Sequence, residues 1–230
     1  MSLSKNVCLI PAKGASTRLK KKNIQSINGK EMIYYSINAA INSKLFEEKD
    51  VIVSTESDDV AEIAKKHGAN IPYKRDEKLA HDPYGCKDVA LDFLEKNPDY
   101  KEYDNLFIVM PTAPMILSED FTRAFDVFQK KGHKYLMTVS ETDQNAQRTF
   151  FVKDGFMEPL FPDKILKRTQ ELEPTYSPNG AVIIVNIADF LESKTYFKFP
   201  IGVYVMPRER SIDVDTEIDF KIARVLMGDY

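Results

Sequence analysis

The stretch that decides the fold lies near the start of the chain, where residues 7–23 read VCLIPAKGASTRLKKKN. Its first four residues form an apolar run with the length of a buried strand, and the rest is a polar loop of small and basic residues. A helical pattern follows, in which Ile33, Ile37, Ala40 and Ile41 share one helix face. This order of strand, loop and helix is typical of the first unit of a parallel α/β sheet.

The same alternation continues along most of the chain. Further strands are predicted at residues 51–53, 69–73, 106–110, 135–140, 181–185 and 203–206. Helices are predicted around Phe93 and after two expected N-caps, Ser57 and Ser118, and a final helix is predicted to begin near Thr216. The sequence therefore predicts an α/β fold, a doubly wound and mostly parallel sheet with helices on both faces.

The pattern changes over residues 141–176. A hairpin with an Asp154-Gly155 turn is predicted within this segment, and a polar stretch interrupted by prolines follows it. A lone hairpin is only marginally stable in water, so we expect this segment to be an inserted arm rather than a second independent fold. The chain is then one domain, residues 1–230, with the arm inside it.

Composition excludes several classes of protein. The 230 residues carry 32 Lys+Arg against 35 Asp+Glu, a net charge of −3, and this balance argues against a nucleic-acid partner. No apolar run approaches the roughly 20 residues of a membrane span, so no membrane partner is expected. Cys8 and Cys86 are expected to be reduced thiols, and no signal peptide is recognisable, which favours a cytoplasmic location.

Positive charge gathers in the first loop, which carries Lys13, Arg18, Lys20, Lys21 and Lys22. Small residues at positions 12 and 14–16 allow close backbone approach to a ligand, and successive backbone N–H groups can form an anion-binding nest. Ligands of open α/β sheets bind at the carboxyl ends of the strands. A polyphosphate site is therefore indicated, although the loop matches neither the Walker pattern nor the dinucleotide fingerprint. A solvated basic loop is the alternative.

Two carboxylates near the end of the chain, Asp213 and Asp215, are candidate metal ligands. In an extended segment their spacing places both on the same side of the chain. Oxygen ligands of this kind suit Mg²⁺, which bridges phosphates. The alternative is an acidic first turn of the last helix, which interacts favourably with the helix dipole.

Six groups of residues, in order along the chain, carry a family resemblance. They are IPAKGAS at 10–16 with Lys22-Asn23, VSTES at 53–57, RDEKLAHD at 75–82, VMPTAP at 109–114, the pair RTQ at 168–170 and NGA at 179–181, and DVD at 213–215. Together they resemble the acylneuraminate cytidylyltransferases, also called CMP-sialic acid synthetases. Members of that family use CTP to make CMP-activated nine-carbon or related 2-keto sugar acids.

The resemblance implies a nucleotidyltransferase with CTP and a nonulosonic sugar acid as substrates, Mg²⁺ as cofactor, and a homodimer that uses the arm. It implies catalytic roles for Lys22, Asp213 and Asp215, with the two aspartates as metal ligands. The nucleotide-binding residues that it implies are Ala12, Lys13, Gly14, Ala15, Ser16, Arg18, Lys22, Asn23, Arg75 and Cys86. The sugar-binding residues that it implies are Thr112, Arg168, Gln170 and Asn179.

The chain also departs from the family pattern. The departures are Lys13, Ala15, Thr17, Glu56, Met110 and Ile183. They leave the sugar open among N-acetylneuraminic, legionaminic and pseudaminic acids. Two other functions stay open, namely another sugar- or polyol-phosphate nucleotidyltransferase of the same fold and a nucleotide-binding relative that has lost catalysis.

Overall fold

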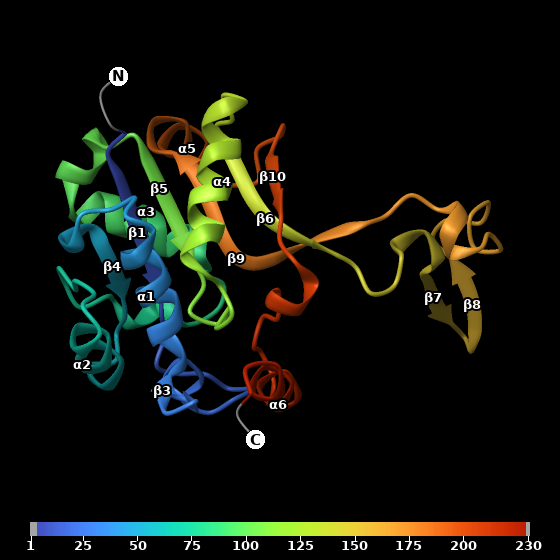
Figure 1. The fold of residues 1–230 in the computed structure, drawn as a ribbon, viewed down its shortest axis with the longest axis horizontal. Helices are drawn as coiled ribbons and strands as arrows, with labels where there is room; N and C mark the ends of the chain where they lie inside the picture. Colours follow the sequence, from blue (N-terminus) through green and yellow to red (C-terminus); the bar gives the residue numbers. More distant parts are fainter. Residues whose placement is uncertain (1–3, 229–230) are drawn as a thin grey trace.

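The protein is described by a computed structural model that covers residues 4–228, so the ends of the expected 1–230 domain lie outside the described residues. Its centre is a six-stranded sheet with the order β10-β6-β9-β5-β1-β4 (Figure 1). Strand β1 pairs in parallel with β4 and β5, and β10 pairs in parallel with β6. Only β9 runs antiparallel to its neighbours. The strands are β1 (Asn6–Pro11), β4 (Val51–Ser54), β5 (Asn105–Val109), β6 (Tyr135–Glu141), β9 (Tyr176–Asn186) and β10 (Gly202–Val205).

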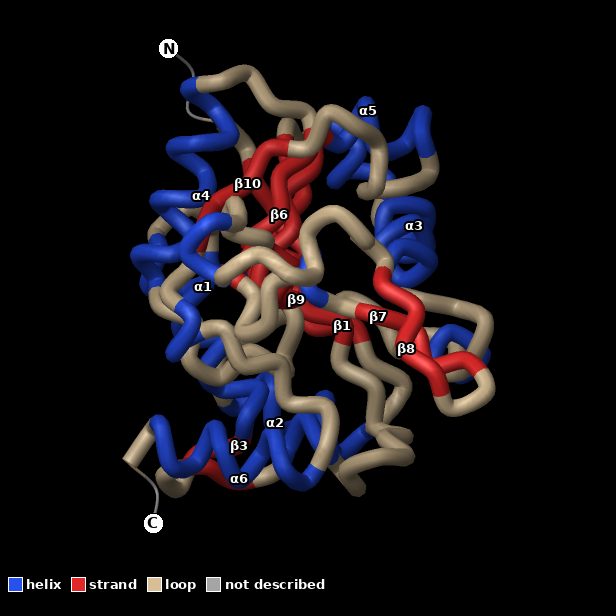
Figure 2. The backbone as a smooth tube through the Cα atoms, turned by 90° about the vertical axis from the view of Figure 1, so that its right-hand side faces the viewer, coloured by secondary structure: helices blue, strands red, loops and turns tan. Residues whose placement is uncertain are grey.

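Helices cover both faces of this sheet, which confirms the doubly wound prediction (Figure 2). One face packs against α1 (Met32–Ser43), α2 (Asp58–Lys66) and α4 (Ser118–Lys130). The other face packs against α3 (Cys86–Lys96) and α5 (Ile187–Ser193). Successive strand side chains point to opposite faces, so Cys8 and Ile10 join the first core and Val7 and Leu9 the second. Continuous apolar runs are what a sheet buried on both faces requires.

A third apolar cluster joins the loop after β1 to the C-terminal part of the chain. Helix α6 (Glu217–Leu226) packs against the short hairpin of β2 (Ser26–Ile27) and β3 (Lys30–Glu31). Leu19 from the loop after β1 and Val214 near the end of the chain are buried in the same cluster. The basic loop and the two candidate metal ligands are therefore held side by side, although about 190 residues separate them in sequence.

Local predictions differ in their outcome. The N-cap at Ser57 is confirmed, because its Oγ accepts the N–H of Val60 at 3.4 Å. Ser118 is the first residue of α4 rather than its cap, and the Leu117 N–H donates back to Asp120 at 2.9 Å. The strand predicted at 69–73 is wrong, since only an isolated bridge joins Asn70 to Ile52.

Short 3₁₀ helices complete the elements: η1 (Lys22–Ile24), η2 (Glu48–Asp50), η3 (Glu77–Ala80), η4 (Pro98–Glu102), η5 (Ala146–Arg148), η6 (Thr169–Glu171) and η7 (Arg208–Arg210).

The segment between β6 and β9 projects away from the sheet as a long arm (Figure 1). Its tip carries the hairpin of β7 (Phe150–Lys153) and β8 (Phe156–Pro159). Asp154 and Gly155 have φ values of 50° and 82°, so the predicted turn is confirmed. Large apolar side chains of the arm are exposed: Phe150, Phe151, Val152, Phe156, Met157, Leu160, Phe161 and Leu166.

Two further observations concern the described residues as a whole. No helix within residues 4–228 combines the length and the apolar character needed to cross a bilayer. Cys8 and Cys86 are both free thiols, as the sequence predicts, and Cys8 is buried in the sheet.

Glu31 gives the fold a measurable pH dependence. Its carboxylate contacts His67 Nε2 at 2.8 Å and Lys66 Nζ at 3.3 Å, and the His67 hydrogen bond is the main reason that its pKa falls from 4.5 to about 2. A depressed folded-state pKa stabilises the fold above the unfolded pKa, and this stabilisation is lost as the pH falls from about 4.5 toward 2. We therefore expect Glu31→Gln to lower the free energy of unfolding by roughly 1 kcal/mol at neutral pH, and by less as the pH falls.

Urea unfolding of both proteins at neutral pH and in acid measures this difference. Glu62→Gln, at an exposed position on α2, is the control and should leave the pH dependence unchanged. A Glu31→Gln deficit that stays constant between neutral and acidic pH would contradict the assignment.

Candidate active site

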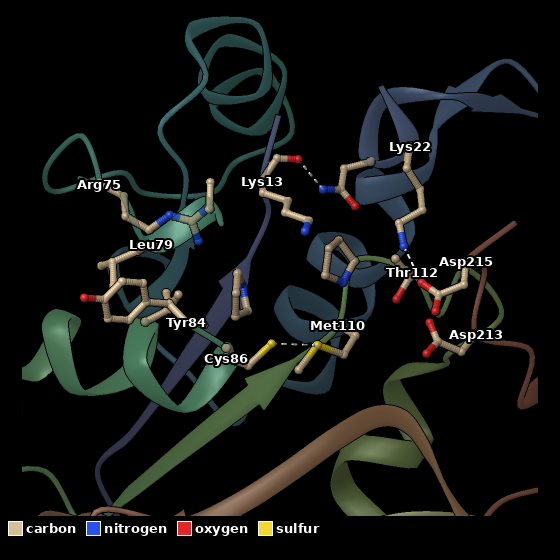
Figure 3. Close-up of a pocket in the computed structure, with 16 residues that line it drawn as sticks. Lys13, Lys22, Arg75, Leu79, Tyr84, Cys86, Met110, Thr112, Asp213 and Asp215 are labelled. Carbon is tan, nitrogen blue, oxygen red and sulfur yellow. Dashed lines mark hydrogen bonds and ion pairs between the residues drawn. The ribbon is translucent and has the colours of Figure 1, made fainter. Parts of the chain in front are cut away.

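A cavity of about 240 Å³ opens at the carboxyl ends of β1 and β5, where ligands of open α/β sheets are expected (Figure 3). Its walls come from four parts of the chain: the loop after β1, the segment that leads into α3, the turn after β5 and the segment before α6. The lining residues are Pro11, Lys13, Lys22, Asn23, Arg75, Leu79, Ala80, Tyr84, Gly85, Cys86, Val89, Met110, Pro111, Thr112, Asp213 and Asp215.

Two of the five cations of the first loop, Lys13 and Lys22, line the cavity. Lys22 is only 13% exposed in its side chain, and its Nζ lies 2.6 Å from Asp215 Oδ1. Arg18 contacts the other oxygen of Asp215 at 2.7 Å. Lys13 lines the cavity, and its carbonyl accepts a hydrogen bond from the buried Asn23 at 2.8 Å. Lys21 pairs instead with Asp59, outside the lining residues.

Three backbone amides of the predicted anion nest are hydrogen-bonded within the protein. The Ala12 N–H donates to the Ser54 carbonyl at 2.9 Å, because the backbone continues the pairing of β1 with β4. The Gly14 N–H donates to Glu56 at 2.6 Å, and the Ser16 N–H donates to the Gly14 carbonyl at 3.1 Å. Neither these three residues nor Ala15 line the cavity, so the loop offers it side chains, chiefly of Lys13 and Lys22.

The wall opposite the carboxylates combines apolar surface with one buried cation. Arg75 is 3% exposed and donates through Nη2 to Glu56, while its buried Nε has no hydrogen-bond partner among the described residues. The Cys86 thiol lies 3.5 Å from the sulfur of Met110, and burial raises its pKa, so it stays protonated. Leu79 and the exposed Tyr84 complete this wall (Figure 3). A flat ring with polar edges fits such surroundings.

The carboxylate wall is held by short hydrogen bonds. The Val214 N–H donates to the Thr112 carbonyl at 2.8 Å, which fixes the chain between the two aspartates. Partial burial raises the pKa of Asp213, and a hydrogen bond from Thr112 opposes that rise. Partial burial acts in the same direction on Asp215, but Lys22 and Arg18 outweigh it and keep its pKa below the usual value.

The two aspartates fit a hard divalent cation. Asp213 is accessible from the cavity and makes no ion pair with any residue between 4 and 228, and the adjacent charge of Asp215 adds to the rise of its pKa. No cluster of three or more His, Cys, Asp or Glu side chains suited to a metal occurs in the described part of the chain. Mg²⁺ usually takes one or two carboxylates and completes its shell with water and phosphate oxygens, so this donor set is sufficient for it.

Of the predicted sugar-binding residues, only Thr112 lines the cavity. Arg168 and Gln170 are exposed on the arm. Asn179 lies within β9 and is buried, where its amide accepts from Thr138 at 2.6 Å and donates to Ser211 at 3.0 Å. These bonds fix the chain behind the aspartates.

Gly180 explains the Asn-Gly pair in β9. Its φ of +69° accompanies a shift in the pairing register of β6 with β9, and a Cβ atom there would lie 3.2 Å from Asp213 Oδ2. A positive φ and a close approach both favour glycine. The Asn179-Gly180 pair therefore shapes the position of Asp213 instead of facing the cavity.

Several residues in or beside the cavity have no role that the sequence indicates. Glu56, which holds Gly14 and Arg75, was visible only as a departure from the family pattern. Tyr84, Leu79 and Pro111 carry no chemical signature, and their presence in the lining depends on the tertiary fold. Met110 was noted only because a glutamine was expected at its position.

Comparison with known proteins agrees with this geometry. The profile of a family described as Cytidylyltransferase matches residues 7–154. A pseudaminic acid cytidylyltransferase from Campylobacter jejuni subsp. jejuni serotype O:2 is 33% identical over 224 residues, which cover 96% of each chain. An N-acylneuraminate cytidylyltransferase from Streptococcus agalactiae serotype V is 33% identical over 94% of this chain and 52% of its own length.

Among solved structures, a CMP:2-keto-3-deoxy-manno-octonic acid synthetase complexed with CTP superposes with a TM-score of 0.70. The alignment covers 98% of this chain and 99% of that one at 18% identity, and it supports the fold. The sheet order, the cavity at the strand ends and the matches over nearly the whole length lead to one assignment. The chain belongs to the cytidylyltransferase family of nucleotidyltransferases.

Proposed function

We propose that the protein transfers CMP from CTP to the anomeric hydroxyl of a nonulosonic sugar acid and releases pyrophosphate. The observation that carries this proposal is the division of one cavity into two sides. One side is lined by Lys13, Lys22, Asp213 and Asp215, of which Lys22 and Asp215 form an ion pair. Arg75 and its apolar neighbours form the other side. A triphosphate with its metal suits the first side, and a pyrimidine suits the second.

The sugar class is supported by the relatives. The proteins named above as pseudaminic acid and N-acylneuraminate cytidylyltransferases have the same identity to this chain, 33%. They support a nonulosonic acid as acceptor and do not choose between these two acids. Legionaminic acid stays a third candidate from the sequence.

Lys22 acts on the leaving group in this proposal. Its ammonium group lies at the boundary between the phosphate loop and Asp215, where it can neutralise charge that develops on departing pyrophosphate. Lys13 and Arg18 add positive charge on the same side. Asp213 and Asp215 would hold Mg²⁺, which supplies charge neutralisation at the triphosphate and acidifies the attacking hydroxyl.

Acceptor binding would begin at Thr112, which lines the cavity and hydrogen-bonds Asp213 through its side chain. Arg168 and Gln170 lie on the arm, away from the cavity of their own chain. They can bind a sugar acid if the arm of one chain reaches the cavity of a second copy. The exposed aromatic residues of the arm, such as Phe151 and Phe156, favour such an assembly. We therefore propose a homodimer.

Light scattering at micromolar concentration is expected to give twice the mass of one chain. Replacing Phe151 and Phe156 together with serine should shift the protein toward a single chain. The matched control changes Val203 and Val205, exposed on the edge strand β10 and outside the hairpin at the tip of the arm, to threonine and should leave the mass unchanged. A single-chain mass for the parent protein would contradict the dimer.

Removal of the two candidate metal ligands tests the cofactor. Asp213→Asn and Asp215→Asn are each expected to reduce Mg²⁺-dependent turnover by about a hundredfold or more while the fold stays intact. The Mg²⁺ concentration at half-maximal rate should rise in both variants. Glu217→Gln changes an exposed carboxylate in the first turn of α6 and is the control, because it does not line the cavity. Parent-like rates in both variants would contradict the metal assignment.

The proposed function as a whole is tested with four nucleoside triphosphates against several 2-keto sugar acids. Pyrophosphate release is expected only with CTP, Mg²⁺ and a nonulosonic acid together. Turnover only with a sugar or polyol phosphate would assign the chain to another nucleotidyltransferase function. CTP binding without turnover on any acceptor would assign it to the inactive, nucleotide-binding class.

A further inference from the structure

One carboxylate joins the cavity residue Arg75 to the loop after β1. Glu56 follows β4 by two residues, and its side chain is 11% exposed. Its Oε1 accepts the Gly14 N–H at 2.6 Å, while its Oε2 accepts a hydrogen bond from Arg75. Gly14 belongs to the phosphate-side loop after β1, and Arg75 lies on the apolar wall.

The electrostatics favour a permanently charged bridge. Partial burial would raise the pKa of Glu56, but the hydrogen bonds from Arg75 and Gly14 and the charge of Arg75 outweigh it, so its pKa lies below the usual value. Both carboxylate oxygens therefore act as acceptors. A carboxylate that accepts from a guanidinium is among the stronger hydrogen-bonded contacts in proteins.

Both partners are also fixed independently. The Arg75 N–H donates to the Thr55 carbonyl at 3.0 Å, which ties its backbone to the end of β4. At Gly14, a Cβ atom would lie 2.5 Å from the Cβ of Ser57, so the loop touches the start of α2 directly. The two hydrogen bonds of Glu56 therefore fix what these contacts leave free. They hold the orientation of the Arg75 side chain and the position of the loop backbone at Gly14.

The Arg75 side chain has a donor left for a ligand. Its Nη2 is taken by Glu56, whereas its Nε is buried, without a hydrogen-bond partner among the described residues, in a side chain that lines the cavity. A buried unpaired donor is costly unless a ligand or water satisfies it. The N3 atom of cytosine is an acceptor of the right kind, whereas uracil carries an N–H donor at that position.

We propose that Glu56 is a positioning residue for the nucleotide, which aligns Arg75 with the base and holds the backbone of the phosphate-side loop at Gly14 through a single carboxylate. The inference rests on the proposed function and adds a coupling between base recognition and triphosphate binding. Loss of the bridge should weaken CTP binding and reduce the preference for CTP over UTP at the same time.

Glu56→Gln is the first test, because glutamine keeps the shape but has one acceptor oxygen for two donors. Calorimetry with CTP alone should show a Kd for CTP about tenfold higher than in the parent, as expected for a lost hydrogen bond to a charged group. The ratio of kcat/KM for CTP to that for UTP should fall, whereas KM for the sugar acid should change less than twofold.

Glu56→Asp keeps the charge and should recover part of both quantities. Asp58→Asn is the matched control, since its carboxylate is exposed two residues further on and pairs with Lys74 outside the cavity. Thermal unfolding of each variant separates a loss of folding from a loss of binding. If Glu56→Gln does not fold, the comparison of Glu56→Asp with the parent carries the test.

The outcomes separate the two proposals. A parent protein that binds no CTP would overturn the proposed function before Glu56 is considered. A parent protein that binds CTP, together with a folded Glu56→Gln variant of equal CTP affinity and equal base preference, would overturn the positioning role alone. Weaker binding with an unchanged CTP to UTP ratio would also overturn the coupling.

Discussion

Replacing Lys22 with methionine is expected to lower kcat by about 10²- to 10³-fold, the range seen when a group that stabilises transition-state charge is removed. Lys22 is the most enclosed cation of the first loop, and its ammonium group lies 2.6 Å from Asp215 at the cavity. Methionine keeps most of the side-chain volume and removes the charge. The fold should survive, because Arg18 still pairs with Asp215.

The effect should fall on kcat more than on KM for CTP, because the charge on pyrophosphate grows as the bond to the α-phosphate breaks. Rates at saturating CTP and sugar acid, measured as pyrophosphate release, provide the comparison. Lys20→Met removes an exposed cation of the same loop that does not line the cavity, and it should change kcat less than threefold. If Lys22→Met keeps kcat within a factor of three of the parent, Lys22 is not the leaving-group cation.

Asp120→Ala is expected to have the largest effect on stability, a loss of about 3 kcal/mol in the free energy of unfolding. Asp120 is 1% exposed and is in the first turn of α4. It accepts two hydrogen bonds from Arg210 and one from the Leu117 N–H at 2.9 Å. The substitution removes the cap of α4 and leaves the partly buried Arg210 without its carboxylate.

The same substitution should also disturb the position of Asp213 and Asp215 in the site. Arg210 ends η7, three residues before Asp213, so its pairing with Asp120 anchors the segment that carries the aspartates. We expect Asp120→Ala to raise the Mg²⁺ concentration needed for half-maximal rate. Asp126→Ala, at an exposed position of α4 that pairs only with Lys130 among the described residues, should cost about 0.5 kcal/mol or less. Urea unfolding that places the two variants within error of each other would contradict the anchor.

Much of the fold follows from local rules that the sequence displays openly. Residues 7–10 and 106–110 are apolar enough for strands buried on both faces, and the Asp154-Gly155 pair has the backbone freedom that its turn needs. The strand predicted at 69–73 failed because only Asn70 reaches β4. Helix α5 is not predicted from the sequence because its seven residues are too few for a clear periodic pattern. Its N-cap, Asn186, is also the last residue of strand β9, so no loop separates the two elements.

The site was predictable where the family motifs carry it. The resemblance implies Lys22, Asp213 and Asp215 together, and they line one cavity. Asn179 was not predictable, because the same Asn-Gly pair can form a ligand contact or a bulge, and only the pairing of β6 with β9 decides. The partners of the nest amides were not predictable for a similar reason, since Ser54 of strand β4 and Glu56 accept the N–H groups of Ala12 and Gly14.

The most direct test of the proposed CMP transfer is mass spectrometry of a single reaction with CTP, Mg²⁺ and a nonulosonic acid. The expected result is a conjugate whose mass equals the sugar acid plus CMP less water, formed in equal amount with pyrophosphate and absent when any of the three components is omitted. Pyrophosphate released with free CMP and no conjugate, or no product with any nonulosonic acid tested, would contradict it.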